Sequence, residues 1–347
     1  MRKAAVLAFI ALAGSTLWAA VLPVGVTDFS GWPVRSMSSS AAQAQSSPSY
    51  RGEWTADTRN TWRDNDGEPR VQFNLRTGAG DSRWGFGVRL RDLAGLPTAA
   101  VASVANDVQF SWTREAGTFR FSGAFDNGRG SGTYTFAPDQ AFINNMALAG
   151  YKNLSTDDVV RLAVIDVTIA HVRGLAQAGY PNLPLDDLVR TRIHGATPEN
   201  IKALQAAGIR GQSVDDLIRF RIHKVTPEFI AALASRGYKN VYADDLVKMR
   251  IHNVTLQEMD ELKTLGFGGL DIDTLVRFRI HKVTPEYIKS MKDVGFVMVS
   301  EDQLVKMRIH KVDAKFVRDA RADGFALQTP GDAVDLAIHG PRWRRRG

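Results

Sequence analysis

The sequence SVDDLIRFRIHKVTPEFIAALASRGY, at residues 213–238, decides the fold of most of this chain. Its motif, Asp-Asp-Leu-Val/Ile-Arg-x-Arg-Ile-His-x-Val-Thr-Pro-Glu, returns every 29 residues, as from Gly208 to Gly237. A fixed period of this length is typical of stacked structural repeats, so the sequence predicts an αα-hairpin solenoid over residues 139–340. The period is kept by seven glycines and six of the seven histidines: Gly150, Gly179, Gly208, Gly237, Gly266, Gly295, Gly324, His194, His223, His252, His281, His310 and His339.

Local residue chemistry divides each repeat into two short helices. Thr226 is suited to cap a helix N-terminus, and Pro227 is suited to the first helical position. Gly237 predicts a left-handed stop, after which Tyr238 is spaced to contact Leu233 one turn back. The second helix covers the Asp-Asp-Leu-Val-Arg-x-Arg-Ile-His segment. Its expected N-caps are Ser155, Ser213, Asp271 and Ser300, with Pro184 and Tyr242 as poorer caps.

The array carries atypical units at both ends. A half-repeat beginning at Asp139 precedes the first full unit, and another beginning at Thr329 closes the array. In the unit around residues 159–168, Ala163 and Ile165 replace the usual Arg and His. Terminal units that depart from the consensus are expected to cap a stack of repeats.

Residues 50–138 have a different pattern, in which apolar and polar residues alternate. Examples are Val71, Phe73 and Leu75, followed later by Phe110 and Trp112. Alternation with a period of two predicts strands, and the glycine-rich stretch at 126–132 predicts a hairpin turn. We therefore expect an α+β protein: a small antiparallel β barrel or sandwich, followed by the helical repeats. We expect the β domain to have a packed core rather than a ligand cavity.

The N-terminus has the features of an export signal. Arg2 and Lys3 precede an apolar run over residues 4–26, and a small-residue site, Ala-Gln-Ala, ends at residue 44. We interpret residues 1–44 as a signal peptide or an uncleaved inner-membrane anchor, and residues 45–49 as a linker. The chain is then exported, either to the periplasm or outside the cell. It has no cysteine, which excludes disulfides and lipoprotein attachment.

Charge alone says little about the partner. The formal net charge is +7, from 44 Lys and Arg against 37 Asp and Glu, and part of the excess lies in a basic tail at residues 341–347. So modest an excess does not favour nucleic acid, which we do not expect as a partner. The N-terminal apolar run and the tail residues Arg342–Arg346 are the two segments that could contact a membrane.

Two columns of basic residues run through the repeats. The first follows aspartates by four residues, which is a favourable helical ion-pair spacing, and predicts a locally neutralised, solvated face. Its pairs are Asp186/Arg190, Asp215/Arg219, Asp244/Lys248, Asp273/Arg277 and Asp302/Lys306. The second column falls on the apolar side of the helix, where a buried Arg needs a partner. It consists of Arg192, Arg221, Arg250, Arg279 and Arg308.

The second column has two interpretations. It is either a structural ladder between repeats, which we favour, or a basic stripe that binds a partner. For the ladder, the candidate partners are the second Asp of a neighbouring repeat, the Thr-Pro-Glu carboxylate and C-terminal carbonyl groups. The histidine column is expected to be structural, because equivalent positions about 10 Å apart cannot share one zinc ion. His171 lies outside the column, and we interpret it as incidental.

No pattern in the sequence indicates catalysis. Motifs for zinc peptidases, serine hydrolases, phosphate-binding loops and thiol nucleophiles are missing, so we expect no catalytic residue, no cofactor and no metal. The leading hypothesis is a non-catalytic scaffold that binds a protein or an anionic envelope polymer. One alternative is a sensor accessory whose β domain holds a small ligand, and another is an enzyme of unrecognised type.

The repeat motif resembles a known one. Arg-Ile-His-x-Val-Thr-Pro-Glu, followed by Gly-Tyr or Gly-Phe, is similar to repeats in extracytoplasmic extensions of bacterial antirepressor membrane metallopeptidases of the beta-lactamase-regulator type. The segments Trp84-Gly85-Phe86 and Arg114–Phe119 resemble β segments that accompany such repeats. This chain lacks the peptidase motif and the multiple membrane spans of that family, so no catalytic residue is carried over. The resemblance implies a role in envelope sensing or interaction.

Overall fold

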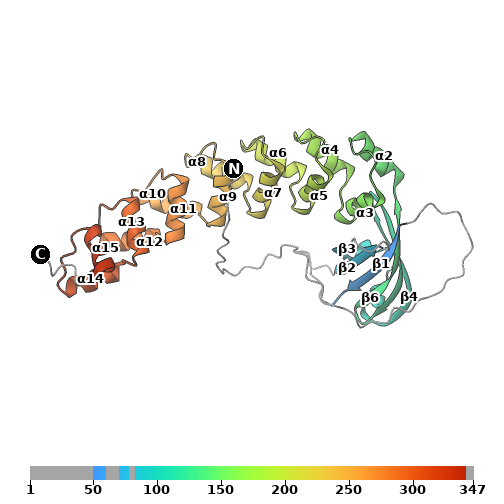
Figure 1. The fold of residues 1–347 in the computed structure, drawn as a ribbon, viewed down its shortest axis with the longest axis horizontal. Coiled ribbons are helices and arrows are strands. Elements are labelled where there is room, and N and C mark those ends of the chain that lie inside the picture. Colours follow the sequence, from blue (N-terminus) through green and yellow to red (C-terminus); the bar gives the residue numbers. More distant parts are fainter. Residues whose placement is uncertain (1–49, 60–69, 78–82, 341–347) are drawn as a thin grey trace, which may run out of the picture. The chain divides into compact units, whose positions relative to one another are not determined.

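The computed structural model describes residues 50–59, 70–77 and 83–340, which all belong to the compact unit Pro48–Gly347. The predicted signal, linker and basic tail lie outside the described residues. Within the described ranges, no helix is long and apolar enough to cross a membrane. The chain is of the α+β class, with a six-stranded antiparallel sheet followed by helices (Figure 1).

The sheet is built from strands of seven to ten residues. Its spatial order is β3-β2-β1-β6-β5-β4, so the first strand along the chain lies in the middle, paired with β2 and β6. A two-residue turn with positive φ at Asn127 and Gly128 joins β5 to β6, as the glycine-rich stretch predicted. The strands are β1 Tyr50–Asp57, β2 Arg70–Thr77, β3 Arg83–Arg89, β4 Ala105–Arg114, β5 Gly117–Asp126 and β6 Arg129–Pro138.

The expectation of a barrel or sandwich is wrong, because there is one open sheet. Closure would require β3 to pair with β4, and the described strands show no such pairing. The connection between these two strands contains η1 Leu90–Asp92 and α1 Thr98–Ala102. Ala94 in this connection exchanges two backbone hydrogen bonds with Ser111 of β4, at 2.9 and 2.8 Å. These bonds use part of the β4 edge that a closing strand would need.

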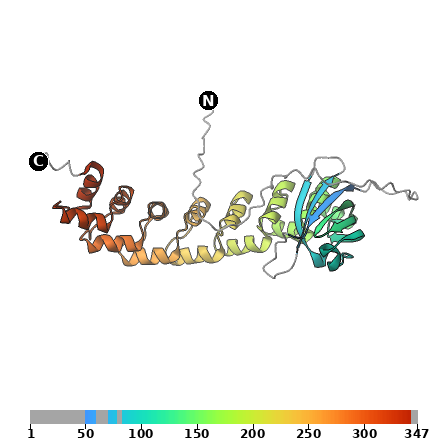
Figure 2. The same ribbon diagram turned by 90° about the horizontal axis from the view of Figure 1, so that it is seen from below.

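The helices after the sheet lie in two rows, one of even-numbered and one of odd-numbered helices (Figures 1 and 2). Neighbours in a row pack together, as α5 does with α7 and α4 with α6. The even row is α2 Gln140–Leu148, α4 Ile169–Gln177, α6 Pro198–Ala206, α8 Pro227–Ser235, α10 Leu256–Thr264, α12 Pro285–Asp293 and α14 Ala314–Ala322. The odd row is α3 Thr156–Ile165, α5 Leu185–Ile193, α7 Val214–Ile222, α9 Ala243–Ile251, α11 Ile272–His281, α13 Glu301–Ile309 and α15 Pro330–His339.

Each even helix begins and ends at the residues that the sequence marks. The Thr226 hydroxyl accepts a hydrogen bond from the Phe229 N–H at 3.2 Å, and Pro227 is the first residue of α8. At the other end Gly237 has a φ of +98°, and the Tyr238 N–H donates to the Leu233 carbonyl at 3.1 Å. This is the bond of a Schellman stop. Equivalent φ angles, from 91° to 96°, occur at Gly179, Gly208, Gly266 and Gly295.

The odd helices end on a second left-handed residue, which the sequence did not reveal. Lys224 has a φ of +56°, and the Val225 N–H then donates to the Phe220 carbonyl at 2.8 Å. L-residues other than Asn are disfavoured at positive φ, whereas Gly adopts it readily because it has no Cβ. The same position is taken by Asp166, Gly195, Asn253, Lys282 and Lys311, all with positive φ.

The sheet joins the array through the turn between β4 and β5. The Glu115 carboxylate accepts the N–H of Ile169 at the start of α4, at 3.2 Å. Arg114 lies 3.4 Å from the carboxylate of Asp166, at the end of α3. On β1, the Tyr50 hydroxyl donates to Asp157 of α3 at 2.6 Å. The sheet therefore makes polar contacts with the first repeat of the kind that one repeat makes with the next.

Candidate interaction surface

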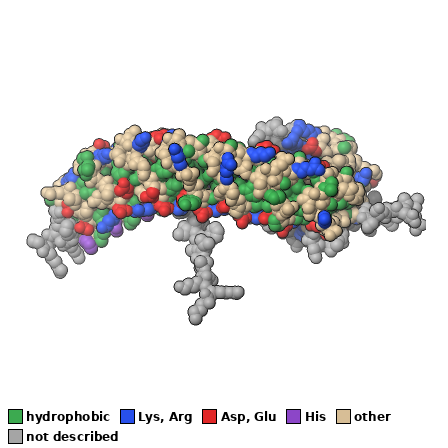
Figure 3. Space-filling view, turned by 90° about the horizontal axis from the view of Figure 1, so that it is seen from above, with side chains coloured by type: hydrophobic (Ala, Val, Ile, Leu, Met, Phe, Trp, Pro, Cys, Tyr) green, Lys and Arg blue, Asp and Glu red, His purple; other side chains and the backbone are tan. Residues whose placement is uncertain are grey.

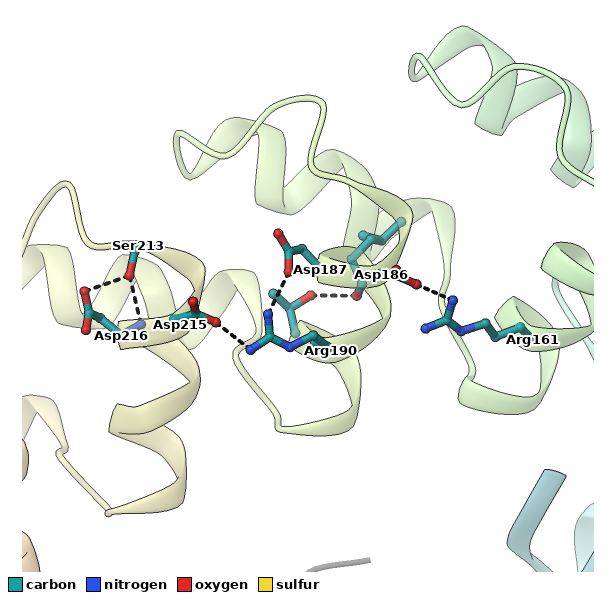
Figure 4. A network of polar contacts seen from close by, with 9 residues as sticks. Arg161, Asp186, Asp187, Arg190, Ser213, Asp215 and Asp216 are labelled. Carbon is teal, nitrogen blue, oxygen red and sulfur yellow. Dashed lines mark hydrogen bonds and ion pairs between the residues drawn. The ribbon is translucent and has the colours of Figure 1, made fainter. Parts of the chain in front are cut away.

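The first basic column forms an ion-pair ladder between repeats, a contact that the sequence analysis did not assign. Arg190 lies 2.5 Å from Asp215 of the next repeat and 2.8 Å from Asp187 in its own helix (Figure 4). Its predicted partner, Asp186, instead binds Arg161 of the preceding repeat. The expected pairing between residues i and i+4 is therefore wrong for this column. The inter-repeat pairs are Arg161–Asp186, Arg190–Asp215, Arg219–Asp244, Lys248–Asp273 and Arg277–Asp302, at 2.5–2.7 Å.

The acidic and basic side chains of the ladder neutralise one another. The ladder cations of α5, α7 and α9 each also contact the second Asp of their own helix, at 2.8–3.4 Å; these cations are Arg190, Arg219 and Lys248. The hydrogen bond to Asp215 raises the pKa of Arg190 above its ordinary value, and Asp187 adds to this. Each first-column Asp lies in the first turn of a helix, where the helix dipole also favours a negative charge. This edge of the array has little charge left for a partner.

The second arginine column makes a different set of contacts. Arg250, Arg279 and Arg308 each donate from Nε to the carbonyl of the histidine that ends the preceding odd helix, at 3.3 Å. Of the three partners considered from the sequence, the C-terminal carbonyl is therefore the recurring one. Such carbonyls have no partner within their own helix, so a basic donor is favourable there. The acceptors are His223, His252 and His281.

The rest of each guanidinium in this column meets rings or isolated carboxylates. Arg250 lies over the ring of Phe229 at 5.0 Å, and Arg308 over Tyr287 at 4.7 Å. Arg279 lies 3.2 Å from the carboxylate of Glu258, whose pKa is raised by burial against the opposing charge of Arg279.

The first two arginines of this column depart from the pattern. Arg192 binds the Asp166 side chain at 2.7 Å and the Asp166 carbonyl at 2.8 Å. Arg221 is exposed and runs beside Gly195, where an added Cβ would come within 3.5 Å of its Nε atom. The five arginines thus occupy one position in the repeat but do not form one uniform ladder.

An exposed isoleucine stands beside each of these arginines, and the sequence analysis missed it. Ile222 is 54% exposed although it lies in the motif that defines the repeat. At 100° per residue it falls about 140° from Leu217, outside the buried arc, so a helical wheel would have found it. The column is Ile193, Ile222, Ile251, Ile280, Ile309 and Ile338, with 46–56% of each residue exposed.

The histidines that follow lie at helix ends. His194, His223, His252 and His310 are C-cap residues, while His281 and His339 are the last residues of their helices. Burial, and next the charge of Arg219, lowers the pKa of His223. Within the part of the chain that the structure describes, no group of three or more His, Cys, Asp or Glu residues is placed to hold a metal ion.

His171 has a definite structural role, so the interpretation that it is incidental is wrong. It is 7% exposed, and its Nε2 lies 3.1 Å from the hydroxyl of Thr191, which is completely buried. Thr191 donates to the Leu188 carbonyl at 2.7 Å, so it accepts from the His171 ring. Burial, and next the charge of Arg192, lowers the pKa of His171 to about 4. The imidazole is therefore neutral at pH 7.

The face shown in Figure 3 mixes acidic and basic side chains along the repeats, with no large area of a single charge. A shallow groove of about 260 Å³ lies between α2 and α4, lined by Leu148, Tyr151 and Tyr180 among others. Comparison with family models, curated proteins and solved structures finds no match to this chain.

Proposed function

We propose that this chain is an exported, non-catalytic interaction scaffold, in which the repeats form a solenoid that binds a protein or an envelope polymer. The observation that carries the proposal is the second arginine column. Its guanidinium groups recur at one position in five successive repeats. Within the described residues, three of them, Arg221, Arg250 and Arg308, pair with no carboxylate. Positive charge held in register along a row of helices suits an elongated anionic partner.

The contrast with the ladder supports this proposal. Arg219 uses two carboxylates, Asp216 and Asp244, for a purely internal contact. If the second column served only to join repeats, carboxylates could neutralise it in the same way. A stack of six units at about 10 Å each would present a surface of order 60 Å.

The sensor alternative, with a small ligand inside the β domain, has less support. The rings of Trp54, Phe73, Phe110 and Phe121 lie 4.7–6.0 Å from one another, and each residue is at most 4% exposed. Such distances are those of directly packed aromatic side chains. These four side chains are therefore packed against one another in the core of the sheet.

In-cell crosslinking of the intact protein, followed by mass spectrometry, tests the proposal. We compare the wild type with a variant in which Arg192, Arg221, Arg250, Arg279 and Arg308 are all changed to Gln. The matched control changes Arg190, Arg219, Lys248 and Arg277 to Gln, which removes similar charges from the ladder. Circular dichroism melting establishes that both variants are folded.

We expect the wild type and the ladder control to capture the same envelope component, and the second-column variant to lose it. Capture of nothing by the folded wild type would contradict the scaffold. Equal loss in both variants would show that binding depends on overall charge rather than on the second column.

A further inference from the structure

The exposed isoleucines form a ridge that packing does not require. We define the Arg-Ile-His ridge as residues 192–194, 221–223, 250–252, 279–281 and 308–310. In α7, Leu217 and Ile218 are 2% and 3% exposed, whereas Ile222 is 54% exposed. The three residues share one helix, so the difference lies in the face that each occupies. Single exposed apolar residues are common, but one at the same position in every repeat makes a continuous row.

Other exposed apolar residues lack this regularity. Tyr242 is 79% exposed, but the same position is Ser213 one repeat earlier and Asp271 one repeat later. Met298 is 91% exposed, and its counterpart one repeat earlier is Gly269. Among the exposed large apolar residues of the described part of the chain, only the isoleucine of the ridge recurs through all five repeats.

The ridge is basic as well as apolar. Besides the arginines, it is followed directly by Lys224, Lys282 and Lys311, all exposed and held at positive φ. In the described part of the chain, carboxylates contact the arginines of the ridge only at Arg192 and Arg279. Charge complementarity therefore requires an anionic partner, and the isoleucines require that partner to carry apolar groups.

We propose that the Arg-Ile-His ridge binds an extended, acidic polypeptide segment with an apolar side chain at about every third residue. This inference rests on the scaffold function and names its partner class. Three residues of extended chain span about 10 Å, which equals the expected spacing of packed helices. One apolar side chain can then meet each isoleucine while neighbouring carboxylates meet Arg or Lys. A polyanion without side chains of this kind would leave the isoleucines uncovered.

Peptide probes of fixed period test this inference on the full chain. The probe is a fluorescein-labelled peptide, (Glu-Leu-Ser)₅, followed by fluorescence anisotropy. Comparison peptides are (Glu-Ser-Ser)₅, which keeps the charge alone, and a peptide of the same composition with leucines at irregular spacing. We expect the regular peptide to bind at least tenfold more tightly than either comparison peptide.

The ridge variant changes Ile222, Ile251 and Ile280 to Thr, which keeps β-branching at three half-exposed positions. The matched control changes Leu148, Tyr242 and Met298 to Thr, which removes exposed apolar side chains elsewhere. We expect the ridge variant to bind the regular peptide at least tenfold more weakly, and the control to bind it as the wild type does. A second variant, Lys224→Gln with Lys282→Gln, should weaken binding without touching the isoleucines.

Each contrary result has a distinct meaning. Absence of binding to all three peptides would overturn the proposed partner chemistry, and equal binding by the ridge variant and the wild type would overturn the ridge as the site. If in-cell crosslinking still captures an envelope component through the ridge variant, the scaffold function stands and only this inference fails. If the wild type captures nothing in the cell, the scaffold function itself fails, whatever the peptides show.

Discussion

The two basic columns lie on the same helices, two residues apart, but their cations contact different kinds of partner. Arg219 is held between two aspartates, one from its own helix and one from the next repeat. Arg250 donates to a backbone carbonyl and covers a phenyl ring, and it contacts no carboxylate in the part of the chain that the structure describes. Ion pairs neutralise the ladder cations, whereas Arg221, Arg250 and Arg308 of the second column pair with no carboxylate among the described residues. The ladder therefore joins repeats, and the ridge is the surface that we propose for a partner.

The same contrast is seen where the array meets the sheet. At the start of the ladder, Asp157 has no basic residue from a preceding repeat and accepts from Tyr50 of β1 instead. At the start of the second column, Asp166 binds both Arg192 and Arg114 of the sheet. The first repeat thus neutralises an arginine whose counterparts Arg221, Arg250 and Arg308 pair with no carboxylate among the described residues. The unit that the sequence marks as degenerate is adapted to the sheet at both edges.

The largest expected effect is a loss of folding stability at acid pH, which originates at the start of the ridge and not in the ladder. His171 packs under the start of the ridge with a folded-state pKa of about 4, against about 6.5 when unfolded. The unfolded chain binds the additional proton between these values, so stability is full above pH 6.5 and falls as the pH drops toward 4. The whole loss is about 3 kcal/mol. Urea unfolding at pH 7 and pH 4.5 measures most of it.

His171→Gln, which cannot titrate, should remove most of this pH dependence. Asp215→Asn, a ladder substitution, should keep it. If the two variants show the same slope of stability against pH, the acid sensitivity does not originate at His171.

The next largest effect on stability is expected in the loop that follows each even-numbered helix. Gly237→Val places a β-branched residue at a φ of +98°, and no atom lies within 4 Å of the added Cβ. The cost is therefore conformational rather than steric, and should be about 2 kcal/mol of unfolding free energy. Lys239→Val, in the same loop without positive φ, is the control. Thermal melting of both variants checks this, and equal melting temperatures would contradict the assigned helix stop.

A smaller effect of opposite sign is expected next to the ridge. Lys224 occupies positive φ, while Gly195 takes the same position one repeat earlier. Lys224→Gly should stabilise the protein by about 1 kcal/mol, because glycine carries no Cβ penalty there. Lys224→Ala removes the charge but keeps the penalty, so it should not stabilise. Differential scanning calorimetry of both variants measures the difference.

The same Lys224→Gly variant should bind the regular acidic peptide more weakly. A gain of stability joined to a loss of binding would indicate that lysine is kept at this position for a partner. A gain of stability with unchanged binding would place Lys224 outside the recognition surface.

The sequence predicts most of the helical elements because their signals are local. Thr226 and Gly237 mark a start and a stop through bonds to residues three to five positions away. Whether the sheet closes is not predictable in this way, since it depends on whether β3 and β4 pair at their edges. Alternation along a strand shows which residues face the core, but it does not show which strands meet at an edge.

The ladder shows a second limit, which comes from periodicity itself. Asp215 lies four residues before Arg219, and its equivalent Asp244 lies 25 residues after it. A 29-residue period always supplies both partners together, so the sequence pattern is identical for either pairing. Only the placement of α7 against α9 brings Arg219 to Asp244. The exposure of the ridge isoleucines has a different origin, because it follows from the face of the helix that each isoleucine occupies.

The smallest expected effect tests whether the two columns differ in kind. Arg219→Gln removes ion pairs to aspartates, one of them 79% exposed, and should cost about 0.5 kcal/mol at low salt. In 1 M NaCl this cost should vanish, because the screening length falls to about 3 Å. Arg250→Gln loses a carbonyl hydrogen bond and a ring contact, at a similar cost of about 0.5 kcal/mol.

The cost of Arg250→Gln should change less with salt, since its two partners carry no net charge. Urea unfolding of both variants at 0.05 M and 1 M NaCl makes the comparison. If both costs vanish together in salt, Arg250 takes part in long-range ion pairing after all. The second column would then be a weaker ladder, and its positive charge would be satisfied within the protein rather than available to a partner.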